Sequence, residues 1–524
     1  MREPAARRAV GGTLGAALAA AVAFLLAPPM GTDLSAQTAR ADFFARHGGA
    51  VLDLGWYGGV SPYGYSLLTP APMAWFGVRE VGAGAAVLSA VLLVVLLLRT
   101  GARRPVAGGL LGVVGIFGNL VSGRVTFAVG VLFALAALVA VTLPGRRRWV
   151  GVTAGALLAA GASPVAGLFV GLAAAGLLLT GAGRRVDAML LGAGAALPMS
   201  VMALLFGVGG RMNISGWDTL RAVTAGLLVA WLVPRRPVRV AAALSAAGVL
   251  AAFLIATPVG LNAVRLAAMF TLPVLAGYAV LPQRLRLAGA SGAQRAARVA
   301  LPVVLVAVGL WQPPVSVADL RGAGAPTASV AYFRPLLDEL RRRGPVGRIE
   351  VVPTGDYWEA AYVAGVVPLA RGWLRQADID RNPLFFDGSL DAERYRRWLH
   401  RNGVRLVAIA SAAPSWVGRR EAELIRGGLP YLTPVWRTAD WTLYEVAGEP
   451  SIVNGASLVS STGRALTVDV AAGGAVTVRV RWSRWLRLRG PGCLAPAADG
   501  WTTLRVPGPG RYRLTSGFTA GPRC

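Results

Sequence analysis

The chain has 524 residues, of which 55% are hydrophobic and only 15% are charged. Soluble globular proteins usually carry about a quarter charged residues, so this composition argues against a soluble protein and favours a membrane protein. The formal net charge is +28, but many of the arginines fall in short clusters between apolar runs, which argues against a nucleic-acid-binding face.

Eleven apolar runs precede residue 313, and we expect each of them to form a transmembrane helix. Several are shorter than the roughly 20 residues that a full crossing needs, which packing inside a bundle allows. The first run follows a short basic segment, so a cleaved signal peptide is the alternative to an uncleaved first helix. The runs lie at residues 10–28, 82–98, 106–121, 125–144, 149–161, 164–181, 187–206, 218–233, 240–257, 264–281 and 299–312.

Arginine clusters occupy every second connection between these runs. They comprise Arg99, Arg103 and Arg104; Arg146 to Arg148; Arg184 and Arg185; Arg235, Arg236 and Arg239; and Arg284, Arg286, Arg295 and Arg298. Because cytoplasmic loops of membrane proteins are enriched in basic residues, we expect the N-terminus to lie in the cytoplasm. Eleven crossings then carry residues 313–524 to the extracytoplasmic side of the plasma membrane.

The connection over residues 29–81 is far longer than the others. It mixes apolar residues with acidic, basic and aromatic ones, which predicts short helices lying at the membrane interface. Long ordered loops are uncommon and usually functional. We expect a helical domain over residues 1–312 that includes this loop. Its polar and aromatic candidates are Asp33, Gln37, Arg40, Asp42, His47, Asp53, Trp56 and Tyr57.

A linker is expected at residues 313–329, followed by two extracytoplasmic domains. Alternating helix and strand patterns predict a small α/β domain over residues 330–447. Short alternating strands with Gly and Pro turns predict a β-sandwich-like or jelly-roll-like domain over residues 448–524. Cys493 and Cys524 are the two cysteines, and in an oxidising compartment we expect one disulfide rather than two free thiols.

Asp33 follows the first apolar run by a few residues. Its carboxylate either caps a helix that starts at Leu34 or acts as a general base in a cavity, and the two roles are compatible. Asp42, Asp53 and His47 add titratable groups, but their spacing fits no strong metal motif. We therefore expect no tightly bound zinc, and a requirement for a divalent cation stays open.

Arg265 stands at the start of the tenth apolar run, close to Asn262. An arginine in an apolar segment is costly, so it either extends to the interface or binds an anion such as a phosphate at the outer leaflet. Arg124 and Arg211 are weaker cases of the same kind. The stretch 355–378 mixes aromatic and charged residues, which favours either carbohydrate or protein recognition or internal packing.

The layout resembles that of the GT-C superfamily of membrane glycosyltransferases. The resemblance rests on Gly31-Thr32-Asp33 after the first helix, a large first external loop, many further helices and an external C-terminal domain. The segments 53–59 (DLGWYGG), 62–65 (PYGY), 162–167 (ASPVAG) and 371–373 (RGW) also resemble uncharacterised actinobacterial membrane proteins.

The resemblance implies an enzyme that transfers a sugar from a polyprenyl-phosphate-linked donor to a cell-envelope glycan, lipid or protein. Asp33 would inherit the role of the base, and Arg265 would hold the lipid phosphate. Many family members carry two adjacent acidic residues, whereas Asp33 is flanked by Thr32 and Leu34. A second acid must then come from Asp42, Asp53 or elsewhere.

The alternatives are a transporter or flippase of an envelope precursor and a non-catalytic envelope scaffold. The apolar runs have few polar residues at their centres, and eleven helices exceed what anchoring needs. We therefore expect a glycosyltransferase whose partners are the bilayer, the lipid-linked donor and the acceptor, with no nucleic acid. The expected catalytic residues are Asp33 and Asp42, and the expected substrate-binding residues are Gln37, Arg40, His47, Asp53, Trp56, Tyr57, Asn262 and Arg265.

Overall fold

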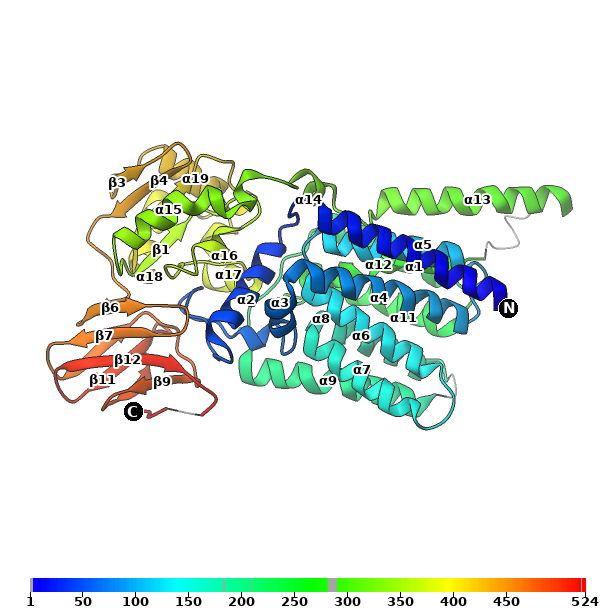
Figure 1. Ribbon diagram of the computed structural model, residues 1–524, viewed down its shortest axis with the longest axis horizontal. Helices are drawn as coiled ribbons and strands as arrows, with labels where there is room; N and C mark the ends of the chain where they lie inside the picture. Colours follow the sequence, from blue (N-terminus) through cyan, green and yellow to red (C-terminus); the bar gives the residue numbers. More distant parts are fainter. Residues whose placement is uncertain (1–2, 182–183, 208, 281–289, 520) are drawn as a thin grey trace. The chain divides into compact units, whose positions relative to one another are not determined.

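The computed structural model describes residues 3–181, 184–207, 209–280, 290–519 and 521–524 (Figure 1). The chain divides into two compact units. A helical unit comprises Met1–Gly31, Tyr65–Leu205 and Arg211–Ala323, and a C-terminal unit comprises Thr32–Gly64, Phe206–Gly210 and Gly324–Cys524. Arg284 and Arg286 of the last arginine cluster lie outside the described residues.

Each apolar run predicted from the sequence coincides with a helix over most of its described residues. Five segments are long and apolar enough to cross a membrane, namely α1, α4, α9, α11 and Gly260–Tyr278, which identifies a membrane protein. The helices are α1 (Glu3–Leu26), α4 (Val78–Arg99), α5 (Pro105–Val121), α6 (Val125–Val141), α7 (Arg148–Ala162), α8 (Pro164–Leu179), α9 (Arg185–Phe206), α10 (Gly216–Leu232), α11 (Arg236–Leu254), α12 (Arg265–Tyr278, after the 3-10 turn η2, Gly260–Val264) and α13 (Ala290–Trp311).

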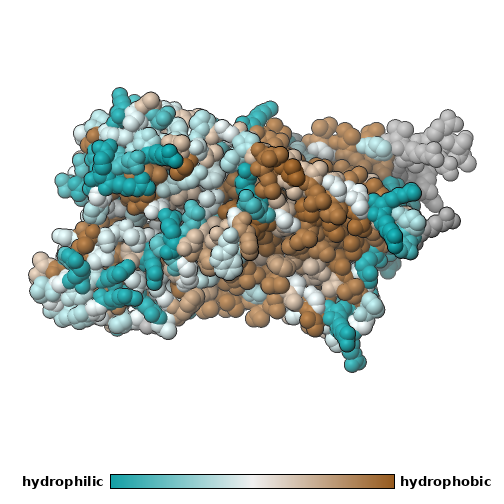
Figure 2. All heavy atoms as spheres, in the orientation of Figure 1, coloured by the Kyte–Doolittle hydropathy of each residue, from teal (hydrophilic) through white to brown (hydrophobic). Residues whose placement is uncertain are grey.

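Small residues set the packing inside this bundle. A Cβ atom on Gly115 of α5 would lie 2.3 Å from the Met269 carbonyl oxygen of α12, so only glycine fits there. The outer surface is apolar, as Figure 2 shows for the visible face. Leu18 on α1 and Leu310 on α13 are 50% and 76% exposed. Lipid chains can cover such a surface, whereas a water-soluble protein rarely exposes one.

The arginine-rich connections meet at one end of the helices of this unit. Arg99 Nε donates to Thr142 Oγ1 at 2.6 Å, and Arg104 Nη2 donates to the Ala279 carbonyl at 2.6 Å. These guanidinium groups satisfy the polar groups at the C-terminal ends of α6 and α12, where cations are favoured. The clusters that the sequence assigns to alternate connections therefore contact the same end of the bundle.

The first part of the C-terminal unit is a four-stranded sheet of order β1-β2-β4-β3. β1 (Arg348–Val351) runs parallel to β2 (Val404–Ala410), whereas β4 (Trp441–Val446) is antiparallel to β2 and to β3 (Leu432–Arg437). The accompanying helices are α15 (Val330–Arg342), α16 (Glu359–Tyr362), α17 (Arg375–Arg381), α18 (Ala392–Asn402) and α19 (Arg419–Arg426). The stretch predicted as a linker holds α14 (Val317–Arg321) and a 3-10 turn, η4 (Pro326–Ala328).

The second part is a β-sandwich. Its sheets have the orders β10-β11-β8-β5 and β6-β7-β12-β9, and apolar side chains of both form one core. The strands are β5 (Val453–Asn454), β6 (Ser457–Ser461), β7 (Leu466–Val470), β8 (Gly474–Val478), β9 (Leu486–Arg489), β10 (Cys493–Pro496), β11 (Thr502–Val506) and β12 (Gly510–Ser516). Cys493 and Cys524 are joined in a disulfide with an S–S distance of 2.09 Å.

Residues 32–64 of the long first loop belong to the C-terminal unit. Leu52 and Leu54 lie in the sandwich core, and the Leu54 amide donates to the Gly463 carbonyl at 2.7 Å. The Arg481 amide, just beyond the end of β8, donates to the Gly58 carbonyl at 2.7 Å. The sequence analysis grouped this loop with the helical domain.

The two helices of the first loop differ in their surroundings. α2 (Leu34–His47) packs against α16 and buries Leu34, Ala36 and Phe43, and it is part of the C-terminal unit. α3 (Pro70–Phe76) belongs to the helical unit and leaves Trp75 and Phe76 about 70% exposed. Exposed aromatic residues of this kind are typical of a helix at a membrane interface.

Candidate functional site

Asp33 and Asp42, the two candidate catalytic acids, lie on different sides of α2. Asp33 is half-buried at the N-cap position, and its carboxylate accepts no capping hydrogen bond from the helix. Asp42 is exposed nine residues further on, which is about 13 Å along the axis and half a turn around it. The structure therefore does not bring Asp33 and Asp42 to the same reacting atom.

Asp53 and His47 lie beside one another instead. Asp53 opens a hairpin in which its amide donates to the Val60 carbonyl at 2.8 Å, and its carboxylate accepts the Gly55 N–H at 2.8 Å. Both groups face the space above Gly463. A Cβ there would lie 3.3 Å from Asp53 Oδ1 and 3.5 Å from His47 Nε2. This juxtaposition of the loop with β-sandwich residues is invisible in the local sequence.

The two groups have shifted proton affinities. Burial raises the pKa of Asp53 to about 7, although the Gly55 N–H and the cations Arg46 and Arg40 act in the opposite direction. Burial lowers the pKa of His47, and Arg46 shifts it the same way. A carboxyl group that exchanges its proton near neutral pH is suited either to acid–base chemistry or to a pH-dependent contact.

The raised pKa of Asp53 makes the stability of the C-terminal unit depend on pH. Between about pH 4 and pH 7 the folded chain binds more protons at Asp53 than the unfolded chain, so the free energy of unfolding falls as the pH rises through this window. We expect Asp53→Asn to remove this part of the dependence when thermal unfolding of the full chain is measured from pH 4 to pH 8. Asp338→Asn, at an exposed site, is the control, and an unchanged slope in Asp53→Asn would contradict the assignment.

Trp56 and Tyr57 fasten the loop to the α/β part. Trp56 is 2% exposed, and its Nε1 donates to the Ala360 carbonyl at 2.9 Å. Tyr57 adopts a left-handed backbone conformation with φ of 55°, and its hydroxyl donates to the Gly372 carbonyl at 2.6 Å. A Cβ on Gly372 would lie 2.5 Å from the Trp56 ring, so Gly372 has to be glycine. The segments DLGWYGG and RGW thus pack against each other.

Gln37 and Arg40 are also buried on α2. Arg40 donates to the Ala36 carbonyl at 3.2 Å and lies 5.4 Å from the centre of the Trp56 ring. This cation–π contact covers one face of the indole. Among the candidate substrate-binding residues of the loop, His47 and Asp53 are half-exposed, whereas Gln37, Arg40, Trp56 and Tyr57 are buried.

A buried ionic network surrounds Arg371 of the RGW segment. Its guanidinium lies 3.1 Å from Asp378, 3.3 Å from Glu421 and 3.5 Å from Glu350. All four side chains are at most 7% exposed. The sequence analysis missed this network because its acids come from three separate elements. Tyr357 stacks on Trp373 with a 3.7 Å centroid distance, which agrees with the packing alternative for residues 355–378.

The remaining candidate residues, Arg265 and Asn262, belong to the helical unit and lie at one end of it. Arg265 begins α12, and its guanidinium lies 5.2 Å from the centre of the Phe127 ring on α6. Arg124 is the residue immediately before α6 and lies three positions before Phe127. Asn262 is buried in η2. Gly31 packs onto the turn between α5 and α6, since a Cβ there would lie 2.4 Å from backbone atoms.

The end of the helical unit that holds Arg265 lies opposite the arginine-rich end, because it holds the C-terminus of α5 and the N-terminus of α6. Two guanidinium groups beside a helix N-terminus are suited to bind an oxyanion such as a phosphate. Within the described ranges, no group of three or more His, Cys, Asp or Glu side chains is arranged to hold a metal ion.

No known protein-family model matches the chain, and no curated protein matches it. Among solved structures, the chain is similar to the arabinofuranosyltransferase AftD from Mycobacteria, with 13% identity over 98% of this chain and a TM-score of 0.43. It spans 57% of the length of that AftD chain. It is also similar to ArnT from Cupriavidus metallidurans in the apo state, with 12% identity, a TM-score of 0.48, and coverage of 84% of this chain and 98% of ArnT. Because these TM-scores lie below 0.5, we base the function on the residues of the chain itself.

Proposed function

We propose that the chain is a membrane glycosyltransferase that moves a sugar from a polyprenyl-phosphate-linked donor to an acceptor of the cell envelope, on the extracytoplasmic face. The observation that carries the proposal is the placement of Arg265 and Arg124 beside the N-terminus of α6. The positive-inside rule assigns the opposite, arginine-rich end to the cytoplasm. The two arginines then lie at the outer membrane surface, where a lipid phosphate is found.

The proposed reaction uses residues named above. An acceptor hydroxyl attacks the anomeric carbon of the donor sugar, and the bond from that carbon to the phosphate oxygen breaks. Polyprenyl phosphate leaves with the bonding electrons, and Arg265 and Arg124 stabilise its negative charge. Asp33 takes the proton of the acceptor hydroxyl.

The test is a transfer assay in right-side-out membrane vesicles that contain the full-length chain. A radiolabelled polyprenyl-phosphate sugar is supplied to the outer leaflet, and label in envelope glycan, lipid or protein is measured. Vesicles without the chain give the baseline, and EDTA with and without added Mg²⁺ measures dependence on a divalent cation. Covalent transfer supports the proposal. Movement of the donor across the membrane without a covalent product would instead indicate a transporter.

Arg265→Gln is expected to raise the KM for the lipid-linked donor about 10- to 100-fold, because a hydrogen bond to a charged group is worth roughly 1.5–3 kcal/mol. The KM for the acceptor should change little. Arg321→Gln is the matched control, since Arg321 is an exposed arginine of α14 in the same unit. An unchanged donor KM in Arg265→Gln would exclude Arg265 as the phosphate ligand.

A further inference from the structure

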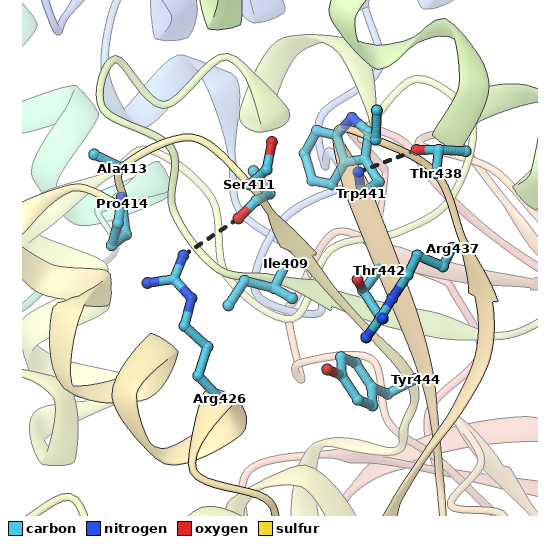
Figure 3. A pocket seen from close by; sticks show the side chains of 12 residues that line it. Ile409, Ser411, Ala413, Pro414, Arg426, Arg437, Thr438, Trp441, Thr442 and Tyr444 are labelled. Carbon is cyan, nitrogen blue, oxygen red and sulfur yellow. Dashed lines mark hydrogen bonds between the residues drawn. The ribbon is translucent and has the colours of Figure 1, made fainter.

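A hollow of about 590 Å³ lies in the α/β part of the C-terminal unit, at the carboxyl end of β2 (Figure 3). Its polar lining consists of Ser411, Arg426, Arg437, Thr438, Thr442 and Tyr444. The volume is that of a typical small-molecule site. In sheets with parallel strands, ligands commonly bind beyond the carboxyl ends of the strands. The hollow lies at such an end, that of β2.

The strand register explains why these side chains gather. Thr442 of β4 pairs with Ile409 of β2 on one side and with Arg437 of β3 on the other. Paired residues point to the same face of a sheet. Tyr444, two residues further along β4 than Thr442, points to that face as well. α19 covers the neighbouring part of this face and ends at Arg426. The hollow is thus the uncovered sheet face between the last turn of α19 and the β3–β4 hairpin.

The charged side chains that line the hollow are both arginines, Arg426 and Arg437. Within the described part of the chain, neither Arg426 nor Arg437 forms an ion pair, and no carboxylate lines the hollow. Arg426 Nη2 donates to the Ala410 carbonyl at 3.4 Å. By contrast, Arg405 of the same sheet is paired with Glu445 at 3.2 Å. Unpaired guanidinium groups next to several hydroxyl groups form a set of donors for an oxyanion.

The loops that border the hollow are held in place. The Tyr332 hydroxyl of α15 lies 3.4 Å from Ser411 Oγ and accepts the Ala412 N–H at 3.3 Å. Trp441 Nε1 donates to the Tyr332 carbonyl at 2.9 Å, and Thr438 Oγ1 accepts the Trp441 N–H at 3.1 Å. One tyrosine therefore connects the loop after β2 with the hairpin before β4. Such support fixes the donors before a ligand arrives.

We propose that this hollow binds a monosaccharide unit that carries a phosphate or carboxylate group. Arg426 and Arg437 hold the anionic group, since guanidinium groups recognise both oxyanions through paired hydrogen bonds. Ser411, Thr438 and Thr442 bond the sugar hydroxyls, and the half-exposed ring of Tyr444 offers an apolar surface for the sugar ring. The site lies wholly within the C-terminal unit and does not depend on the proposed transferase activity.

The experiment titrates the purified full-length protein with glucose 6-phosphate, glucuronate, glucose and inorganic phosphate by isothermal calorimetry and ligand-observed NMR. At least one anionic sugar is expected to bind ten times more tightly than both glucose and inorganic phosphate. Comparing glucose 6-phosphate with glucuronate identifies the preferred anion. Arg437→Gln and Arg426→Gln should each weaken that binding at least tenfold. Arg397→Gln, an exposed arginine of α18 outside the hollow, should leave it unchanged.

Both arginines of the hollow are exposed, so their replacement should not alter thermal unfolding, which is measured for each variant. Absence of binding by both anionic sugars, or binding that both arginine variants leave intact, would overturn the proposal. Equal affinity for inorganic phosphate and glucose 6-phosphate would overturn the saccharide part of it. No outcome requires sugar transfer, so failure here is distinct from failure of the transferase proposal.

Discussion

Asp33→Asn is expected to lower the rate of sugar transfer by about 100- to 10,000-fold, the usual contribution of a general base. Asparagine has the size of aspartate but cannot take the proton of the acceptor hydroxyl. It is also an equally good N-cap residue, so the start of α2 should be preserved. The KM for the lipid-linked donor should change little, because the proposed mechanism assigns Asp33 to the acceptor.

Asp42→Asn supplies the matched control for this experiment. Asp42 lies on α2, about 13 Å along the helix axis from Asp33 and on the opposite side of the helix. Its replacement should therefore leave transfer intact. Thermal unfolding of both variants shows whether α2 remains folded. Full activity in Asp33→Asn would remove Asp33 from the mechanism. Loss of activity in Asp42→Asn alone would place the base on the other side of the helix.

Arg371→Met is expected to destabilise the C-terminal unit by about 3–5 kcal/mol, the usual cost of removing one partner from a buried ionic network. The guanidinium is the shared ion-pair partner of Glu350, Asp378 and Glu421, and the methionine side chain cannot replace that charge. Tyr395 donates to Glu421 at 2.7 Å, but a neutral hydroxyl does not balance three carboxylates.

Unfolding of the full chain in denaturant, followed by tryptophan fluorescence, measures this effect. Arg405→Met is the control, because Arg405 is 40% exposed and its pair with Glu445 should be worth less than about 1 kcal/mol. The difference between wild type and Arg371→Met should shrink at low pH. Burial already raises the pKa of Glu421 to about 7, and protonated carboxyl groups need no cation. Equal losses in both variants would contradict a stabilising network.

Much of the helical unit follows from local properties of the chain. An apolar run such as 82–98 has to bury its backbone polar groups, and a helix satisfies them within the segment itself. The observed α4, Val78–Arg99, therefore differs from the prediction only at its ends. In the predicted α/β domain, Gly403, with φ of 63°, ends α18 and β2 follows directly at Val404.

The partners of residues 32–64 could not be found in this way. Trp56 and Tyr57 look like exposed binding residues in an aromatic, glycine-rich loop, yet they bond to Ala360 and Gly372, more than 300 residues away. Local sequence contains no signal for the element against which a short apolar or aromatic segment will pack. Only the folded chain shows that these side chains are internal and that His47 and Asp53 meet above Gly463.

The helices, the alternation of charge between their connections and the β-rich end of the chain follow from the sequence, because hydropathy, charge and alternation act over a few neighbouring residues. The tertiary structure decided which residues meet, because contacts between distant segments depend on the joint packing of several elements. It separated Asp33 from Asp42, gathered three acids around Arg371 and placed Arg265 against Phe127 of α6. It also brought Arg426 and Arg437 to one hollow, since the strand register and the end of α19 leave that part of the sheet uncovered.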